Sequence, residues 1–168
     1  MSLGKVKGKN MSLNNQPILD VCCGGKMFYY DKNDERVLFC DERYFEKKFA
    51  WKTLFEVKPD LIVDFKALPF KDKSFHLVIF DPPHMIWGSE KSFMVQKYGK
   101  LNKNYKEELK RGFDECYRVL RDNGTLIFKW SESQIKLSSI LECFEMKPLI
   151  MQKSSKSSHF CVFFKELN

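Results

Sequence analysis

The sequence predicts an α/β fold with a mostly parallel seven-stranded sheet and a C-terminal antiparallel hairpin. Three observations lead to this prediction. Short apolar runs bounded by turn residues recur along the chain, as expected of strands buried in a parallel sheet. One longer segment, residues 105–120, spaces its apolar residues at helical intervals. Two apolar runs near the C-terminus are joined by a short polar connection, which is typical of a hairpin.

The predicted strands lie at residues 17–21, 37–40, 61–64, 75–80, 125–130, 149–152 and 160–164. The helix over 105–120 is expected to end at Asn123-Gly124. Ser131 and Gln134 resemble a capping box that opens a second helix running to about Phe144. Residues 27–30 could start a short helix, and residues 85–104, which show no clear period, are predicted to form a long functional or mobile loop.

The length and composition fit one globular domain. The chain has 168 residues, of which 43% are hydrophobic and 30% charged. Residues 1–15 show no periodicity, so we expect a flexible arm, natural or added for expression, followed by a single domain at residues 16–168. No apolar run reaches the roughly 18 residues of a membrane span, and no signal peptide is recognisable. A cytoplasmic protein without membrane contact is therefore expected.

The charge is compatible with a nucleic-acid partner. The formal net charge is +7, and removing the three lysines of the first ten residues leaves +4. A mildly basic protein of this kind suits nucleic acid without requiring it. The six cysteines form no CxxC pattern and mostly lie in apolar runs, so neither a disulfide framework nor a metal site is predicted.

Acidic residues follow several of the predicted strands. Asp20 lies at the exit of the first strand, and Asp41, Asp64 and Asp81 end later ones. The carboxyl ends of parallel strands share one edge of the sheet, where ligands bind in open α/β folds. The glycines of Cys22-Cys23-Gly24-Gly25 suit a backbone that approaches a ligand closely, although Gly-Gly is also a common turn. Asp41 lies 21 residues after Asp20, a spacing that suits hydrogen bonds to ribose hydroxyls.

The stretch Asp81-Pro82-Pro83-His84 follows the apolar strand that ends at Phe80. Two prolines cannot donate backbone hydrogen bonds, so the strand must stop there. The result is a rigid turn that carries a carboxylate, two prolyl carbonyls and a ring, and such a turn could clamp a flat group bearing an amine. An ordinary strand-ending turn is the alternative.

The predicted loop at residues 85–104 interleaves lysines with aromatic residues. Bases stack on rings while cations meet phosphates, so this composition favours a substrate lid or a nucleic-acid contact. Its candidates for substrate binding are Trp87, Lys97 and Tyr98. A solvated loop is the alternative.

Together these motifs resemble class I S-adenosylmethionine (SAM)-dependent methyltransferases over residues 17–165. Asp20–Gly25 resembles the motif that holds the methionine part of SAM, and Asp41 matches the acid that binds its ribose. Asp64 with Leu68-Pro69-Phe70 resembles the motif that contacts adenine. Residues 117–120 and 123–126 match the helix and turn before the fifth strand. The resemblance implies a Rossmann-like doubly wound sheet, SAM as cofactor, and cofactor-binding roles for Asp20, Cys22, Gly24, Asp41, Asp64, Phe65 and Leu68.

Asp81-Pro82-Pro83-His84 is similar to the Asp/Asn-Pro-Pro-aromatic motif of amino-methyltransferases that act on adenine N6 or cytosine N4. In that family the side chain and a prolyl carbonyl accept hydrogen bonds from the exocyclic amine, while the aromatic residue stacks on the base. This similarity implies catalytic roles for Asp81, Pro82, Pro83 and His84. The chain as a whole also resembles the small phage- and prophage-type methylases. These resemblances also imply a nucleic-acid partner, DNA rather than RNA.

Three departures from the family pattern keep other functions open. Cys22 and Lys26 stand where glycines are usual, which puts the cofactor affinity in question. His84 replaces the usual aromatic residue and could serve as a general base for a hydroxyl or carboxyl acceptor. No target-recognition domain is recognisable. The alternatives are therefore a methyltransferase for a small molecule or protein, and a non-catalytic module that binds nucleic acid or a partner chain.

Overall fold

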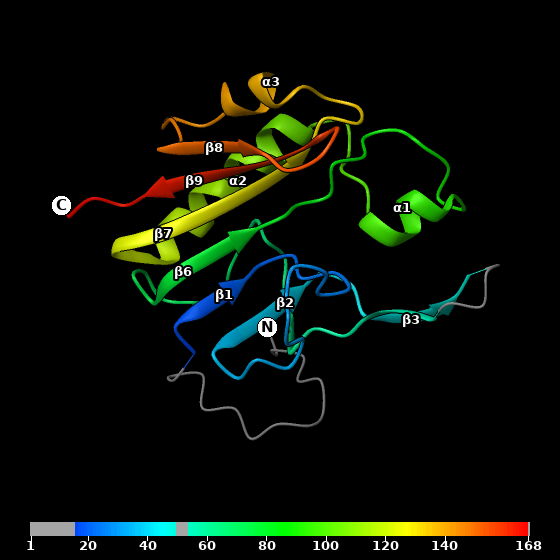
Figure 1. Cartoon of the computed structure of the whole chain (residues 1–168), viewed down its shortest axis with the longest axis horizontal. Helices are drawn as coiled ribbons and strands as arrows, with labels where there is room; N and C mark the ends of the chain where they lie inside the picture. The colour runs from blue at the N-terminus through cyan, green and yellow to red at the C-terminus, as the bar shows by residue number, and fades with distance from the viewer. Residues whose placement is uncertain (1–15, 50–53, 168) are drawn as a thin grey trace.

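The computed structural model describes residues 16–49 and 54–167, so the predicted arm at residues 1–15 lies outside the described residues. Its main feature is a seven-stranded sheet with the order β5-β2-β1-β6-β7-β9-β8 (Figure 1). The first five strands in this order are parallel, and β9 and β8 continue the sheet antiparallel to their neighbours. This arrangement confirms the predicted fold class. The strands are β1 (Ile18–Asp20), β2 (Val37–Asp41), β5 (Leu61–Ile62), β6 (Phe75–Phe80), β7 (Leu120–Ser131), β8 (Ile150–Lys153) and β9 (Ser158–Phe164).

The strand order places a switch point between β1 and β6. From β1 the chain builds outward through β2 to β5, and it then returns to the other side of β1 with β6 and β7. β1 pairs directly with β6, with Asp20 opposite Ile79. In open α/β sheets the crevice outside the carboxyl ends of the strands at such a point is where ligands bind.

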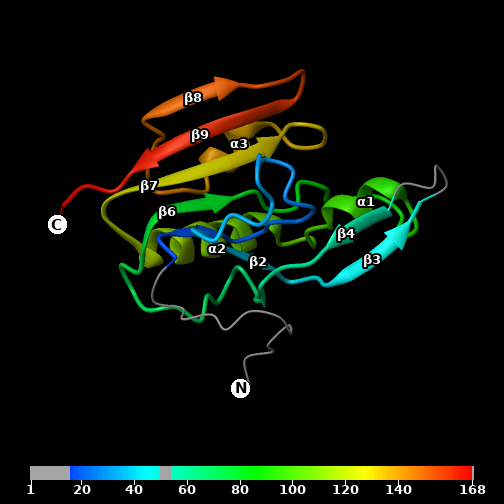
Figure 2. The same ribbon diagram turned by 60° about the horizontal axis from the view of Figure 1, so that its bottom comes forward.

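Two helices pack against one face of the sheet and build the main core (Figure 2). They are α2 (Tyr105–Val119) and α3 (Leu137–Leu141). α2 buries Leu109, Phe113 and Cys116 against the strands, in agreement with its helical apolar spacing. The Phe113 ring stacks on Phe144 with centroids 4.1 Å apart and meets Phe163 of β9 at 4.9 Å.

The opposite face is covered in part by the segment between β1 and β2. This segment consists of turns, so the helix start considered for residues 27–30 is wrong. The cause is local: Asp31 and Asp34 accept backbone N–H groups two residues ahead, and such bonds compete with a helix. The turns still contribute packing, because the Tyr29 ring contacts Phe39 at 4.8 Å.

The structure corrects two further predictions. The expected loop at 85–104 contains a short helix, α1 (Phe93–Tyr98), whose first turn is capped by the Ser92 side chain. The capping box at residue 131 is also wrong. Ser131 is the last residue of β7, and Gln134 uses its side chain to bind the backbone of Ile86 and Trp87 instead.

A small hairpin stands apart from the main sheet in the connection between β2 and β5. It consists of β3 (Phe45–Lys48) and β4 (Leu54–Val57), which form a separate two-stranded sheet. The hairpin extends beside α1 (Figure 2). No pattern in the sequence predicts this hairpin. Among the described residues, no helix has both the length and the apolar character needed to cross a membrane.

Candidate functional site

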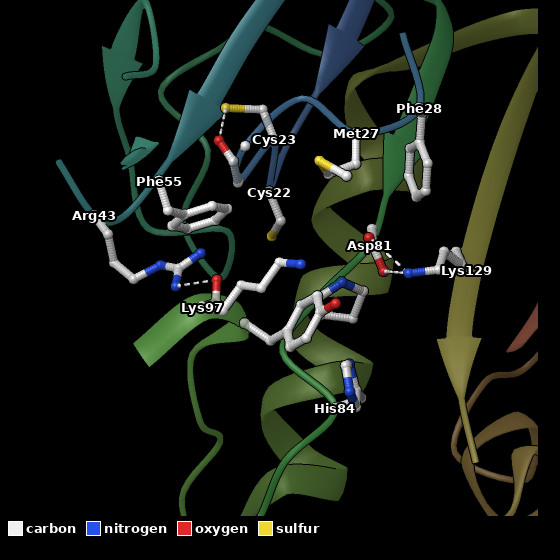
Figure 3. Close-up of a pocket in the computed structure, with 14 residues that line it drawn as sticks. Cys22, Cys23, Met27, Phe28, Arg43, Phe55, Asp81, His84, Lys97 and Lys129 are labelled. Atoms are coloured by element: carbon white, nitrogen blue, oxygen red, sulfur yellow. Dashed lines mark hydrogen bonds and ion pairs between the residues drawn. The ribbon is translucent and has the colours of Figure 1, made fainter. Parts of the chain in front are cut away.

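A cavity of about 150 Å³ lies at the switch point of the sheet (Figure 3). Its walls come from the turn after β1, the turn after β6, the end of β7, the hairpin β3–β4 and helix α1. Of the residues predicted to form a site, those that line the cavity are Cys22, Gly24, Asp81, Pro82, His84, Lys97 and Tyr98. Residues from distant parts of the sequence therefore meet at the edge that the strand-ending acids predict.

Asp81 is paired with a lysine that the sequence analysis does not identify. β6 and β7 run parallel with Phe80 opposite Phe128, so Asp81 and Lys129 follow as neighbours. The Lys129 Nζ atom lies 3.1 Å from both carboxylate oxygens of Asp81. Burial raises the pKa of Asp81 to about 6 although Lys129 acts in the opposite direction. At neutral pH Asp81 is therefore a carboxylate that can accept hydrogen bonds.

The residues after Asp81 form a rigid, buried turn. Pro82 lines the cavity, whereas Pro83 lies behind it and packs against Gly99, where an added Cβ would come within 3.1 Å of the proline ring. His84 is buried, and its ring centroid lies 5.1 Å from that of Tyr98. Burial, followed by the charge of Lys129, lowers the pKa of His84 to about 4, so the ring is neutral at physiological pH.

The turn after β1 lines the cavity with Cys22, Cys23, Gly24 and Gly25. Asp20 accepts the N–H of Cys22 at 3.2 Å and thereby holds the turn. Gly24 has a φ of 48°, and nothing lies within 4 Å of the position that a Cβ would occupy. Burial is the main cause that raises the pKa of Asp20 to about 8, so this carboxyl group is mostly protonated at pH 7.

Asp41 is fully engaged within the protein. Its Oδ2 atom accepts the N–H of Gly24 at 2.9 Å, and its Oδ1 atom accepts the backbone N–H and the Nε–H of Arg43, both at 3.0 Å. Arg43 also donates to the carbonyl of Lys97 on α1 at 3.2 Å. Asp41 therefore ties the glycine turn to the hairpin and α1. A ribose could bind Asp41 only by displacing Arg43.

Four of the other predicted site residues lie away from the cavity. Asp64 is exposed and pairs with Lys66, while Phe65 packs in the core against Phe80. Leu68 is buried beside α2, where its backbone N–H binds Glu115. Trp87 is 56% exposed and does not line the cavity. Their roles in binding cofactor or substrate stay predictions.

The cavity also contains residues that the sequence analysis missed, chiefly Arg43, Phe55 and Lys129. Phe55 on β4 lies over the glycine turn: a Cβ on Gly25 would come within 2.8 Å of its ring. The sequence could have indicated Lys129 as a site residue, because a lysine inside an apolar strand needs an acidic partner on a neighbouring strand. Nothing in the sequence indicated Arg43 or Phe55, since the hairpin itself was not predicted. Within residues 16–49 and 54–167, no group of His, Cys, Asp or Glu is arranged to hold a metal ion.

Comparison with solved structures shows the same fold in proteins of low sequence identity. The PH0226 protein from Pyrococcus horikoshii is 16% identical with a TM-score of 0.56, over 89% of this chain and 81% of its own. The cyclase SpnF is 12% identical with a TM-score of 0.53, over 90% and 74%. A SAM-dependent methyltransferase from Methanosarcina mazei is 11% identical with a TM-score of 0.52, over 92% and 94%.

No family model matches the sequence, and a search of curated proteins finds no match. The structural similarities show the fold alone, because a cyclase and a methyltransferase both have it.

Proposed function

We propose that this protein is a SAM-dependent methyltransferase that methylates an exocyclic amino group of a nucleic-acid base, adenine N6 or cytosine N4, with DNA favoured over RNA. The observation that carries the proposal is the position of Asp81 and Pro82. They end the strand beside the switch point and face a cavity that also contains the glycine turn and two adjacent rings, His84 and Tyr98.

The glycine turn fits the methionine end of SAM. Nothing lies within 4 Å of the position that a Cβ on Gly24 would occupy, and Cys22 and Gly24 line the cavity together with Asp81. The adenosine end needs more room, because the cavity is smaller than the roughly 300–1,000 Å³ of typical ligand pockets. Displacement of Arg43 would free Asp41 for ribose, and movement of Phe55 would uncover Gly25. When bound, SAM would supply the methyl group of its sulfonium, with a neutral thioether as the leaving group.

Asp81 and Pro82 would orient the acceptor amine. The lone pair of an aryl amine is delocalised into the ring, so the nitrogen is a poor nucleophile. Two acceptors that hold its hydrogens, the Asp81 carboxylate and the prolyl carbonyl, favour a pyramidal nitrogen aimed at the methyl group. As the N–C bond forms, the nitrogen must lose one proton. Asp81 is placed to take it and, with a pKa of about 6, to release it to water at neutral pH.

His84 supports a base as substrate better than a hydroxyl or carboxyl acceptor. A histidine with a pKa near 4 is a weak general base, whereas its neutral ring next to Tyr98 is suited to stacking on a base. The small-molecule or protein methyltransferase remains the alternative on the same fold.

The test is transfer of labelled methyl from SAM to single-stranded DNA, duplex DNA and RNA, followed by digestion to nucleosides. We expect label in N6-methyladenine or N4-methylcytosine, with more transfer to DNA than to RNA. If SAM binds but no nucleic acid becomes labelled, the base-methylation proposal is wrong and the acceptor is a small molecule or a protein. If SAM does not bind, the methyltransferase proposal itself is wrong.

A further inference from the structure

The hairpin β3–β4 and helix α1 together form a surface of aromatic rings and lysines next to the cavity. We define this hairpin–α1 surface as Phe45, Lys47, Phe49, Phe55, Phe93 and Lys97. The register of the hairpin puts Phe45 opposite Val57 and Lys47 opposite Phe55, so these side chains share one face. The hairpin runs beside α1 (Figure 2), and Lys47 of β3 binds Gln96 of α1.

The rings form a continuous row from the hairpin to the helix. The centroids of Phe45 and Phe55 lie 5.9 Å apart, those of Phe55 and Phe49 6.2 Å, and those of Phe49 and Phe93 4.6 Å. Phe93 is 39% exposed at the outer end of the row. Phe55, which lies between Phe45 and Phe49 in the row, also lines the cavity.

Two lysines, Lys47 and Lys97, lie among these rings. Lys47 Nζ lies 5.8 Å from the Phe49 ring centroid, and Lys97 Nζ lies 5.7 Å from the centroids of both Phe55 and Phe93. Lys47 binds the neutral side chain of Gln96 at 2.8 Å. Within the part of the chain that the structure describes, neither lysine forms an ion pair with an acidic residue. The acids of the hairpin, Glu46 and Glu56, are both paired with Lys58.

We infer that the hairpin–α1 surface binds a single-stranded nucleic-acid segment and leads one of its nucleotides into the cavity. Alternation of rings and cations suits such a strand, because bases stack on rings of any sequence and phosphates meet the lysines. The surface is continuous with the cavity, because Phe55 and Lys97 belong to both. The Lys97 side chain extends into the cavity (Figure 3). Such a surface would hold its substrate through the sugar-phosphate backbone and by stacking, without reading its sequence. This inference rests on the proposed function for the nature of the partner.

The test compares two adjacent lysines on opposite faces of the hairpin. Lys47 lies on the aromatic face, whereas Lys48 is paired opposite Leu54 and points away from it. Binding of a fluorescein-labelled single-stranded oligonucleotide is measured by anisotropy for the wild type, Lys47→Glu and Lys48→Glu. We expect the Kd to rise roughly tenfold for Lys47→Glu and less than about twofold for Lys48→Glu. Thermal unfolding establishes that both variants are folded.

A salt series supplies a second readout. For single strands, log K falls with log salt concentration by about 0.7 per phosphate contact, so Lys47→Gln/Lys97→Gln should reduce the slope by about 1.4. No binding by the wild type, or equal losses in Lys47→Glu and Lys48→Glu, would overturn the inference. Its failure is distinct from that of the proposed function. If the oligonucleotide binds through Lys47 but is never methylated, only the proposed function is refuted. If methylation does not change when Lys47 is replaced, only the inference about the hairpin–α1 surface is refuted.

Discussion

Asp81 and Lys129 lie on neighbouring parallel strands, and their ion pair sets the charge of the site. Asp81 loses solvation by burial, which favours its protonated form, and Lys129 opposes this from 3.1 Å. A protonated Asp81 would present an O–H group where the proposed chemistry needs an acceptor. Lys129 is therefore a positioning residue that keeps Asp81 ionised.

Replacement of Lys129 by Met should shift the pH dependence of methyl transfer. In the wild type, kcat/KM should fall as the pH drops through about 6, the pKa of Asp81. Without the nearby cation that pKa rises further, so the acid limb should move upward by about one pH unit or more. Lys147→Met, at an exposed position outside the site, is the control. An unchanged profile in Lys129→Met would show that Lys129 does not control Asp81.

His84→Phe separates stacking from proton transfer at the same position. The neutral ring of His84 is buried beside Tyr98, and a phenyl ring can stack there without accepting a proton. We expect kcat/KM on a nucleic-acid substrate to stay within about threefold of the wild type, a change below 1 kcal/mol. A loss of two orders of magnitude with unchanged thermal stability would assign His84 a general-base role and favour another acceptor.

At the scale of elements, the hairpin β3–β4 lies in the connection between β2 and β5 and covers the glycine turn. Phe55 lies over Gly25, and Arg43, just before the hairpin, occupies Asp41. The hairpin therefore narrows the cavity, and in the proposed function it does so on the side assigned to the adenosine half of SAM.

Phe55→Ala should consequently ease cofactor entry. We expect roughly three- to tenfold tighter binding or faster association of SAM, because no ring has to move from Gly25. Isothermal titration and stopped-flow fluorescence measure the two quantities. Phe45→Ala, which alters the same hairpin but not the cavity lining, should leave both within about twofold. Weaker SAM binding in Phe55→Ala would mean that the ring is part of the cofactor site.

The elements that the sequence predicts well are those with strong patterns. β1, β2 and β6 are apolar runs between turn residues, and α2 has a clear helical period, so each lies close to its predicted place. α1 was missed because six residues are too few for a period to be seen. β3 was missed because three of its four residues are exposed and give no alternation. Gln134 was misassigned because its hydrogen bonds reach residues 86 and 87, and such distant contacts leave no local signal.

The same distinction applies to the site. The strand-ending acids and the Pro-Pro turn indicated the correct edge of the sheet, and Cys22, Gly24, Asp81, Pro82, His84, Lys97 and Tyr98 do meet at one cavity. The sequence does not tell which of the predicted residues point into the cavity and which are buried in the core, because the packing between elements decides this. Phe65 and Leu68 carry the expected residue types but are buried in the core.

At the scale of the whole molecule, stability depends mainly on the core on one face of the sheet. Phe113 of α2 joins the helix to Phe144 and to Phe163 of β9 by ring contacts. Phe113→Ala should lower the free energy of unfolding by about 3–5 kcal/mol, since both burial and packing are lost. Urea denaturation measures this. Phe164→Ala, at a position 42% exposed, is the matched control and should cost about 1 kcal/mol or less. Equal losses in the two variants would show that the core is not concentrated on the helical face.

Methyl transfer by Asp81 variants tests the central claim most directly. Asp81→Ala removes the acceptor, and Asp81→Asn keeps an amide oxygen at the same place. We predict that transfer to DNA from labelled SAM falls by about two orders of magnitude or more in Asp81→Ala and is partly retained in Asp81→Asn. SAM binding should be nearly unchanged in both. Because Asp81→Ala leaves Lys129 unpaired, Asp81→Ala/Lys129→Met serves as the variant without a buried charge. Wild-type transfer in either alanine variant would contradict the assignment of Asp81 as the group that orients the amine.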